Sequence, residues 1–308
     1  MGLSILRGAL AGAFAILALG GCAANVEDVD TSDSSLTNSV CGLDPKDPDS
    51  PRIVLDKPFV DDKDAETRLT CLTTMLTAQH DHRGPFAMLY TRTTTKIREG
   101  LAKGRFYDRQ YSEDLTTMFA ELYRRAYVDY VDGKMDEVPD AWRIQFDTAK
   151  KSDEAQASGK KDNVLVLQHM VLGVNAHINR DLSHAVEIVG YQGKSADYRK
   201  KDYEVVRDIL KENVDASLDT VIQKYAEGLG ETPEFVRDLM GKVFYVWMVT
   251  GREKAWEDSK LLMKPWPVNA LADREVNYTS RLMADAILAA NGISPSLMAK
   301  LKQVEGSN

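Results

Sequence analysis

The sequence predicts an all-α protein, in which one multi-helix domain surrounds a central buried helix and follows a signal peptide and a disordered tether. Apolar residues recur at helical spacing almost throughout the chain from residue 58 onward. We find neither alternating apolar–polar runs bounded by hairpin turns nor a repeat of fixed period, so strands and solenoids are not indicated. Residues 163–189 are apolar on most of the helical circumference, which is typical of a helix enclosed by others.

The N-terminus has the pattern of an export signal. Arg7 precedes a short apolar run rich in small residues, which ends in Leu19-Gly20-Gly21-Cys22. This run resembles a bacterial lipoprotein signal, so we expect residues 1–21 to be removed and Cys22 to carry lipid that anchors the protein to a membrane. An ordinary secretory signal or an uncleaved anchor are the alternatives. The expected location is the bacterial cell envelope, and the outer membrane or periplasmic face if the organism has two membranes.

The segment 22–57 is predicted to be a flexible acidic tether, and 58–308 the helical domain. Residues 23–40 are polar and acidic, and such a segment buries too little apolar surface to offset its ordering entropy. After Cys22 the chain has only Cys41 and Cys71, an even pair that in an exported protein is a candidate disulfide. Two unrelated reduced thiols are the alternative.

The element boundaries follow from caps, glycines and prolines. Element counting gives about nine or ten helices. Residues 152–162 are polar and are predicted to form a surface loop. The predicted helical segments are 64–79, 85–104, 112–133, 138–151, 163–189, 195–214, 215–230, 232–250, 251–263 and 270–292.

The charge pattern argues against binding to nucleic acid. The formal net charge is −8, and it becomes −9 when Arg7 leaves with the signal. An acidic surface does not attract a phosphate backbone, and no basic stripe interleaved with aromatic residues is present. The partners that we expect are the membrane, through Cys22, and a small-molecule or lipid-like substrate.

The central segment carries the candidate site. At about 100° per residue, His177, Asp181 and His184 fall on one face, and Asn175 and Asn179 fall on the opposite face. A histidine and an aspartate at i and i+4 can bind one metal such as zinc, or the carboxylate can orient the imidazole.

A metal at this place would need further ligands. His184 could supply a third nitrogen, and His80 and His82, on a predicted loop before Pro85, could join if the two histidine regions meet in space. The alternative is a buried polar network that only fixes the packing of the core.

The stretch "VLQHMVLGVNAHINRDLSHAV" resembles the signature of an uncharacterised bacterial domain family of unknown function, with the core Asn-Ala-His-Ile-Asn-x-Asp-Leu. Flanking stretches such as "PFAMLYTRTTTKI" and "GREKAW" agree in order, so the resemblance covers roughly Asp64 to Met263. It implies an all-helical fold and a site that includes Asn175, His177, Asn179 and Asp181. His184 lies outside the family core.

A second resemblance is to the helical zinc phospholipase C and single-strand nuclease group, whose members carry His-x-x-x-Asp on a core helix. That group uses more histidine and aspartate ligands and usually a mature N-terminal Trp, which a lipidated Cys22 cannot supply.

The sequence leads to two hypotheses about function. The first is a lipid-anchored hydrolase of esters or phosphoesters, metal-assisted or not, with His177 and Asp181 as ligands or as base and orienter. The second is a non-catalytic binding or structural lipoprotein.

Overall fold

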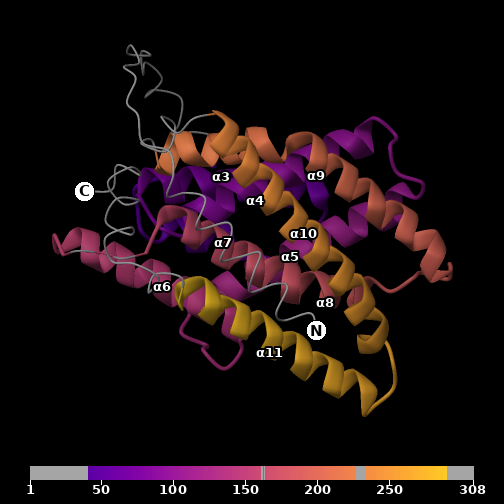
Figure 1. Cartoon of the computed structure of the whole chain (residues 1–308). Coiled ribbons are helices and arrows are strands. Elements are labelled where there is room, and N and C mark those ends of the chain that lie inside the picture. The colour runs from indigo at the N-terminus through magenta and orange to yellow at the C-terminus, as the bar shows by residue number, and fades with distance from the viewer. Residues whose placement is uncertain (1–40, 161, 163, 227–233, 290–308) are drawn as a thin grey trace.

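The computed structural model describes residues 41–289 apart from 161, 163 and 227–233. The predicted signal peptide, Cys22 and residues 23–40 lie outside the described residues. The all-α prediction is confirmed, because the described part of the chain forms helices and contains no strand (Figure 1). The elements are α2 (Ser50–Val54), α3 (Asp62–Ala78), α4 (Gly84–Ala102), α5 (Arg109–Val131), α6 (Asp140–Ala157), α7 (Val166–Ala176), the π-helical turn η1 (His177–Asp181), α8 (Leu182–Val189), α9 (Ala196–Tyr225), α10 (Glu234–Leu262) and α11 (Val268–Ala289).

The rod formed by α7, η1 and α8 lies at the centre of the domain. It contacts α4, α5, α6, α10 and α11, while α9 packs on the outer side of α4 and against α10. In Figure 1 this rod passes through the middle of the bundle, with α3, α4 and α9 on one side and α6 and α11 on the other. Its buried residues include polar ones, among them Gln168, His169 and Asn175. Burying a polar side chain costs free energy unless the side chain is hydrogen-bonded.

A π-helical turn interrupts the central helix at the candidate site. The N–H of Leu182 donates to the carbonyl of His177, which is an i→i+5 bond. Such a turn contains one residue more than an α-helical turn, so everything after it is rotated by roughly 100° relative to an uninterrupted helix. The face shared by His177 and His184 in a regular helix is therefore lost. Isolated π turns inside α-helices occur frequently at functional sites.

Two glycines allow neighbouring helices to approach the central rod. A Cβ on Gly173 would lie 2.3 Å from Cγ of Phe86 on α4, and one on Gly251 of α10 would lie 2.8 Å from Oδ1 of Asn179. Real Cβ contacts are not that short, so a side chain at Gly173 would push α4 away from the rod, whereas one at Gly251 would require the Asn179 and Ile178 side chains to move. These contacts set the distance at which α4 and α10 face the π turn.

Several boundaries differ from the prediction. The predicted boundary between 214 and 215 lies inside one helix, α9, which ends at Tyr225, and the predicted boundary between 250 and 251 lies inside α10, which begins at Glu234. Asp215 and Gly251 are thus accommodated inside helices. The predicted loop 152–162 is helical as far as Ala157. Tertiary packing overrides local propensity at such positions.

The helical body also begins earlier than residue 58. The structure joins Cys41 to Cys71 of α3 in a disulfide. Arg52 on α2 pairs with Asp132 at 2.7 Å, and Leu55 is fully buried. Residues 41–57, predicted as part of the tether, thus pack against the helical domain. Of the helices in the described residues, none is long and apolar enough to cross a bilayer.

Candidate functional site

The π turn brings His177 and Asp181 into direct contact inside the core. Nδ1 of His177 lies 3.2 Å from Oδ2 of Asp181. The same carboxylate oxygen accepts a hydrogen bond of 2.7 Å from Nε1 of Trp142 on α6, and Oδ1 accepts one of 2.8 Å from Arg180. Three donors therefore hold the Asp181 carboxylate in one orientation. An ionised carboxylate only accepts hydrogen bonds, so His177 carries its proton on Nδ1 and keeps a lone pair on Nε2.

The protonation states follow from burial and from the contacts of the pair. Burial lowers the pKa of the His177 imidazole, and the adjacent Asp181 carboxylate opposes this effect without reversing it. Burial would raise the pKa of the Asp181 carboxyl, but the bond from His177 and the charge of Arg180 outweigh it, so the pKa lies below its usual value. At neutral pH the pair is a neutral imidazole beside a carboxylate.

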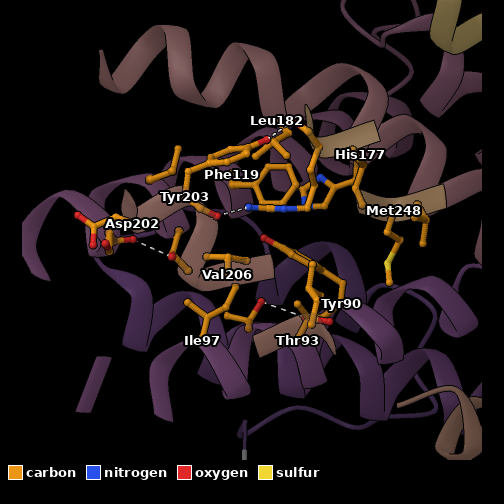
Figure 2. A pocket seen from close by; sticks show the side chains of 18 of the residues that line it. Tyr90, Thr93, Ile97, Phe119, His177, Leu182, Asp202, Tyr203, Val206 and Met248 are labelled. Atoms are coloured by element: carbon orange, nitrogen blue, oxygen red, sulfur yellow. Dashed lines mark hydrogen bonds between the residues drawn. The ribbon is translucent and has the colours of Figure 1, made fainter. Parts of the chain in front are cut away.

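A cavity of about 80 Å³ lies beside His177 (Figure 2). Its walls come mainly from α4, α5, α9, α10 and the central rod of α7, η1 and α8, so it forms only when these elements pack together. The lining is mostly aliphatic and aromatic, as in most small-molecule sites. The residues labelled around it in Figure 2 are Tyr90, Thr93, Ile97, Phe119, His177, Leu182, Asp202, Tyr203, Val206 and Met248.

Aromatic rings fix the plane of the His177 imidazole. Phe119 on α5 stacks on it with a centroid distance of 3.5 Å and an interplanar angle of 10°, and Tyr90 on α4 meets it edge-on at 4.3 Å. Stacking covers the face of the ring, whereas the Nε2 lone pair lies in the ring plane. Nε2 is buried and makes no hydrogen bond within the described chain. A buried polar atom of this kind is expected to meet a ligand or water.

Arg252 and Tyr111 are among the further polar residues that line the cavity. Arg252 on α10 is buried; it donates to the carbonyl of Tyr203 at 2.8 Å and lies over the Tyr203 ring, and within the described chain no carboxylate pairs with it. The hydroxyl of Tyr111 is buried and has no hydrogen-bond partner among the described residues. An unpaired guanidinium in an apolar cavity favours a ligand with a carbonyl or anionic oxygen.

Asp202 lines the cavity, but its carboxylate is hydrogen-bonded to backbone N–H groups. Its two carboxylate oxygens accept the N–H groups of Tyr107 and Asp108 at 2.6 and 3.0 Å. Burial raises the pKa of this carboxyl although these bonds oppose the shift. Asp202 therefore fixes the turn that precedes α5.

The other predicted residues of the central helix lie outside the cavity. Nδ1 of His184 donates to the Arg180 carbonyl at 2.9 Å, and Nε2 lies 2.8 Å from Oδ1 of Asp273 on α11. Asn175 donates to the carbonyl of Ser280 on α11, and Asn179 donates to Asn175. The asparagines brace the central rod against α11, because the opposite face of the rod from His177 is packed on that helix.

The donor set at His177 and Asp181 does not fit a metal. Both oxygens of Asp181 accept hydrogen bonds, Nδ1 of His177 faces that carboxylate, and only Nε2 remains as a ligand atom. A zinc site uses three or four protein ligands. Neither His184 nor the loop histidines approach this pair, so we derive no step through a metal there.

The two histidine regions of the sequence do meet, but at a different place. The ring of His82, from the loop between α3 and α4, lies 4.8 Å from the ring of His169 on α7. Asp162 completes a group of three possible ligands with these two. His80 is exposed and is not part of that group.

Comparison with known families identifies the chain. Residues 63–290 match the sequence model of a family of unknown function, DUF5995. The chain belongs to this family. The DUF5995 match runs from α3 through α11, so it contains the His177–Asp181 pair, the cavity and the second histidine group, and it extends beyond the range Asp64–Met263. No curated protein and no solved structure matches the chain.

Sequence reasoning did not predict the residues that other helices bring to the candidate site. Trp142 and Phe119 come from α6 and α5 and have no local signature, and Arg252 of α10 lies in the stretch "GREKAW" but is not among the predicted site residues. A buried Trp needs a partner for its N–H, which is the one signal that could have pointed to a buried acceptor. Which acceptor it meets depends on the packing of α6 against α7.

Proposed function

We propose that this protein is a hydrolase of small esters in which His177 acts as general base and Asp181 orients it. The observation that carries the proposal is the state of the His177 imidazole, which lines the cavity: its Nδ1 is held by a fixed carboxylate, and its buried Nε2 has no hydrogen-bond partner in the described chain. Orientation by a buried carboxylate is what acid–base catalysis by histidine requires.

In this proposal His177 activates water. Nε2 accepts a proton from water while the water oxygen forms a bond to the ester carbonyl carbon, and the carbonyl electron pair moves to its oxygen. The tetrahedral intermediate then collapses, the bond to the alkoxy group breaks, and the imidazolium returns the proton to the leaving oxygen. Asp181 stabilises the imidazolium, and the Arg252 guanidinium is the charge available for the oxyanion.

The cavity limits the size of the substrate. Its volume of about 80 Å³ is roughly half that of an engineered apolar cavity that accommodates benzene. The acyl group of a good substrate should therefore have only a few carbon atoms, and long-chain esters should be poor substrates.

The test is hydrolysis of p-nitrophenyl acetate, butyrate and palmitate by the purified chain. His177→Gln should lower kcat/KM for acetate by about 10²- to 10⁴-fold, the usual contribution of a general base. His184→Gln is the matched control, since His184 lies on the same rod outside the cavity, and should leave the rate unchanged. Val206→Phe places a larger side chain in the cavity from its α9 wall. It should lower the rate although the His177–Asp181 pair stays in place. Equal rates for the wild type and His177→Gln would exclude the proposal.

Binding without turnover is the second candidate. It is favoured by the Phe119 ring, which stacks on His177 and encloses it, and by the asparagine network, which has a purely structural arrangement. In that case a small apolar ester would raise the melting temperature of the wild type without being cleaved.

We also propose that the protein is a lipoprotein of the cell envelope, anchored through Cys22. The support is the apolar run that ends at Cys22 and the polar, acidic composition of the residues that follow. In a bacterial host, Cys22→Ala should move the protein from the membrane fraction to the soluble fraction. Retention of this variant in the membrane would refute lipid anchoring at Cys22.

A further inference from the structure

A second polar cluster joins three segments that are distant in the sequence. His82 lies in the loop between α3 and α4, Asp162 precedes α7, and His169 lies on α7. One ligand atom from each of these side chains can be chosen so that all three lie within 4.8 Å of one another. None of the three takes part in the His177–Asp181 chemistry.

The two imidazoles have a spacing that suits a common metal ion. Their ring centroids are 4.8 Å apart with an interplanar angle of 56°. With Zn–N bonds of about 2.0–2.1 Å and tetrahedral angles, two ligand rings have centroids roughly 5 Å apart. The ligand atoms, which lie within 4.8 Å of one another, would move closer together to share one ion.

His82 is oriented as a metal ligand usually is. Its Nδ1 lies 2.5 Å from Oδ1 of Asp153 on α6, and the same oxygen accepts the backbone N–H of His82 at 3.1 Å. A metal-bound histidine almost always donates its other ring N–H to a carboxylate or carbonyl, which fixes the ring. With Nδ1 used in this way, Nε2 of His82 is the atom left for a metal.

The cluster contains one fully buried histidine and one that is partly exposed to solvent. His169 is fully buried on the central rod, whereas 17% of the His82 side chain is exposed. Asp162 is partly buried, and its Oδ1 accepts the N–H of Val164 at 3.0 Å. A metal ion could thus reach the site from solvent and find one ligand already fixed.

We propose that His82, His169 and Asp162 bind a zinc ion, with Asp153 as the carboxylate that orients His82. Two imidazoles and one carboxylate are a donor set that zinc accepts, with a fourth position for water. The ion would tie the loop before α7 to the loop before α4. This inference does not depend on the proposed function, because the two sites share no ligand.

The test is zinc binding by the purified chain after removal of metals with a chelator. Zinc added to the wild type should bind at close to one ion per chain and raise the melting temperature. His82→Ala and Asp162→Asn, both at partly exposed positions, should each lower zinc affinity by at least 100-fold, and Asp153→Asn should lower it about 10- to 100-fold. Cobalt in place of zinc should show the visible absorption of a tetrahedral site.

His184→Ala is the matched control. His184 also lies on the central rod beside a carboxylate, Asp273, and its loss should leave zinc affinity unchanged. Circular dichroism establishes that each variant is folded. The proposal is overturned if the wild type does not bind zinc at micromolar concentration, or if His82→Ala and Asp162→Asn bind it as the wild type does. Failure of the ester assay with intact zinc binding would count against the proposed function alone.

Discussion

Replacing Asp181 by Asn tests whether an ionised carboxylate organises the site. In the wild type, Oδ2 accepts bonds from Trp142 and His177, and Oδ1 accepts one from Arg180. The oxygen of the Asn side chain can take the place of Oδ2 and keep the first two bonds. Its NH2 group then faces Arg180, a donor against a donor, so the third bond is lost.

The magnitude follows from these three bonds. Hydrogen bonds to a charged group contribute about 1.5–3 kcal/mol and neutral ones about 0.5–1.5 kcal/mol, so two bonds that become neutral lose about 1 kcal/mol each. The Arg180 side chain is 18% exposed and keeps its bond to Asn277, so the lost bond costs about 1 kcal/mol as well. We expect the free energy of unfolding to fall by about 3 kcal/mol in total.

The assay is urea unfolding at pH 7 followed by circular dichroism. Asp273→Asn is the matched control, because the Asp273 side chain is 52% exposed and accepts bonds from His184 and Asn277. An exposed carboxylate of this kind contributes about 0–1 kcal/mol. If Asp181→Asn lost less than 1 kcal/mol, or no more than Asp273→Asn, the buried carboxylate would not be the ionised centre that we describe.

Two further predictions concern the dyad and the packing around it. Because burial lowers the pKa of His177 in the folded state, the unfolded chain binds more protons below pH 6.5, and folding stability falls as the pH falls through that range. The slope due to His177 reaches at most about 1.4 kcal/mol per pH unit. His177→Gln should remove it, so unfolding curves of both proteins between pH 5 and 7.5 check the sign, and parallel pH dependence would contradict the burial argument. Gly173→Ala should lower the free energy of unfolding by about 1–3 kcal/mol by overpacking against the rigid base of a phenylalanine ring. Gly100→Ala should lower the free energy of unfolding less, because its new Cβ meets the flexible end of an isoleucine side chain. If both variants lost the same stability in thermal unfolding, the contact assigned to Gly173 would be refuted.

The candidate site could be predicted from the sequence only in part. The spacing of His177 and Asp181 sufficed to predict their contact, since i and i+4 are neighbours on any helix-like turn, the π turn included. The same reasoning misplaced His184, because a regular 100° step cannot register the π turn between the two histidines. It also could not tell that His82 would meet His169 rather than His177.

Periodicity alone determined that this chain is built of helices around a central helix in residues 163–189. The reason is that a helix enclosed by others is apolar on most of its faces, which its own sequence reveals. The composition of residues 1–40 is also read from the sequence alone, and it predicts the export signal and the tether. Only the tertiary structure decided which groups meet that rod, namely the indole that binds Asp181 and the rings that fix His177, and where the cavity between the rod and α4, α5, α9 and α10 lies. The physical reason is that a hydrogen bond or a cavity between helices depends on their relative rotation and distance, and small local features such as Gly173 and the π turn set both.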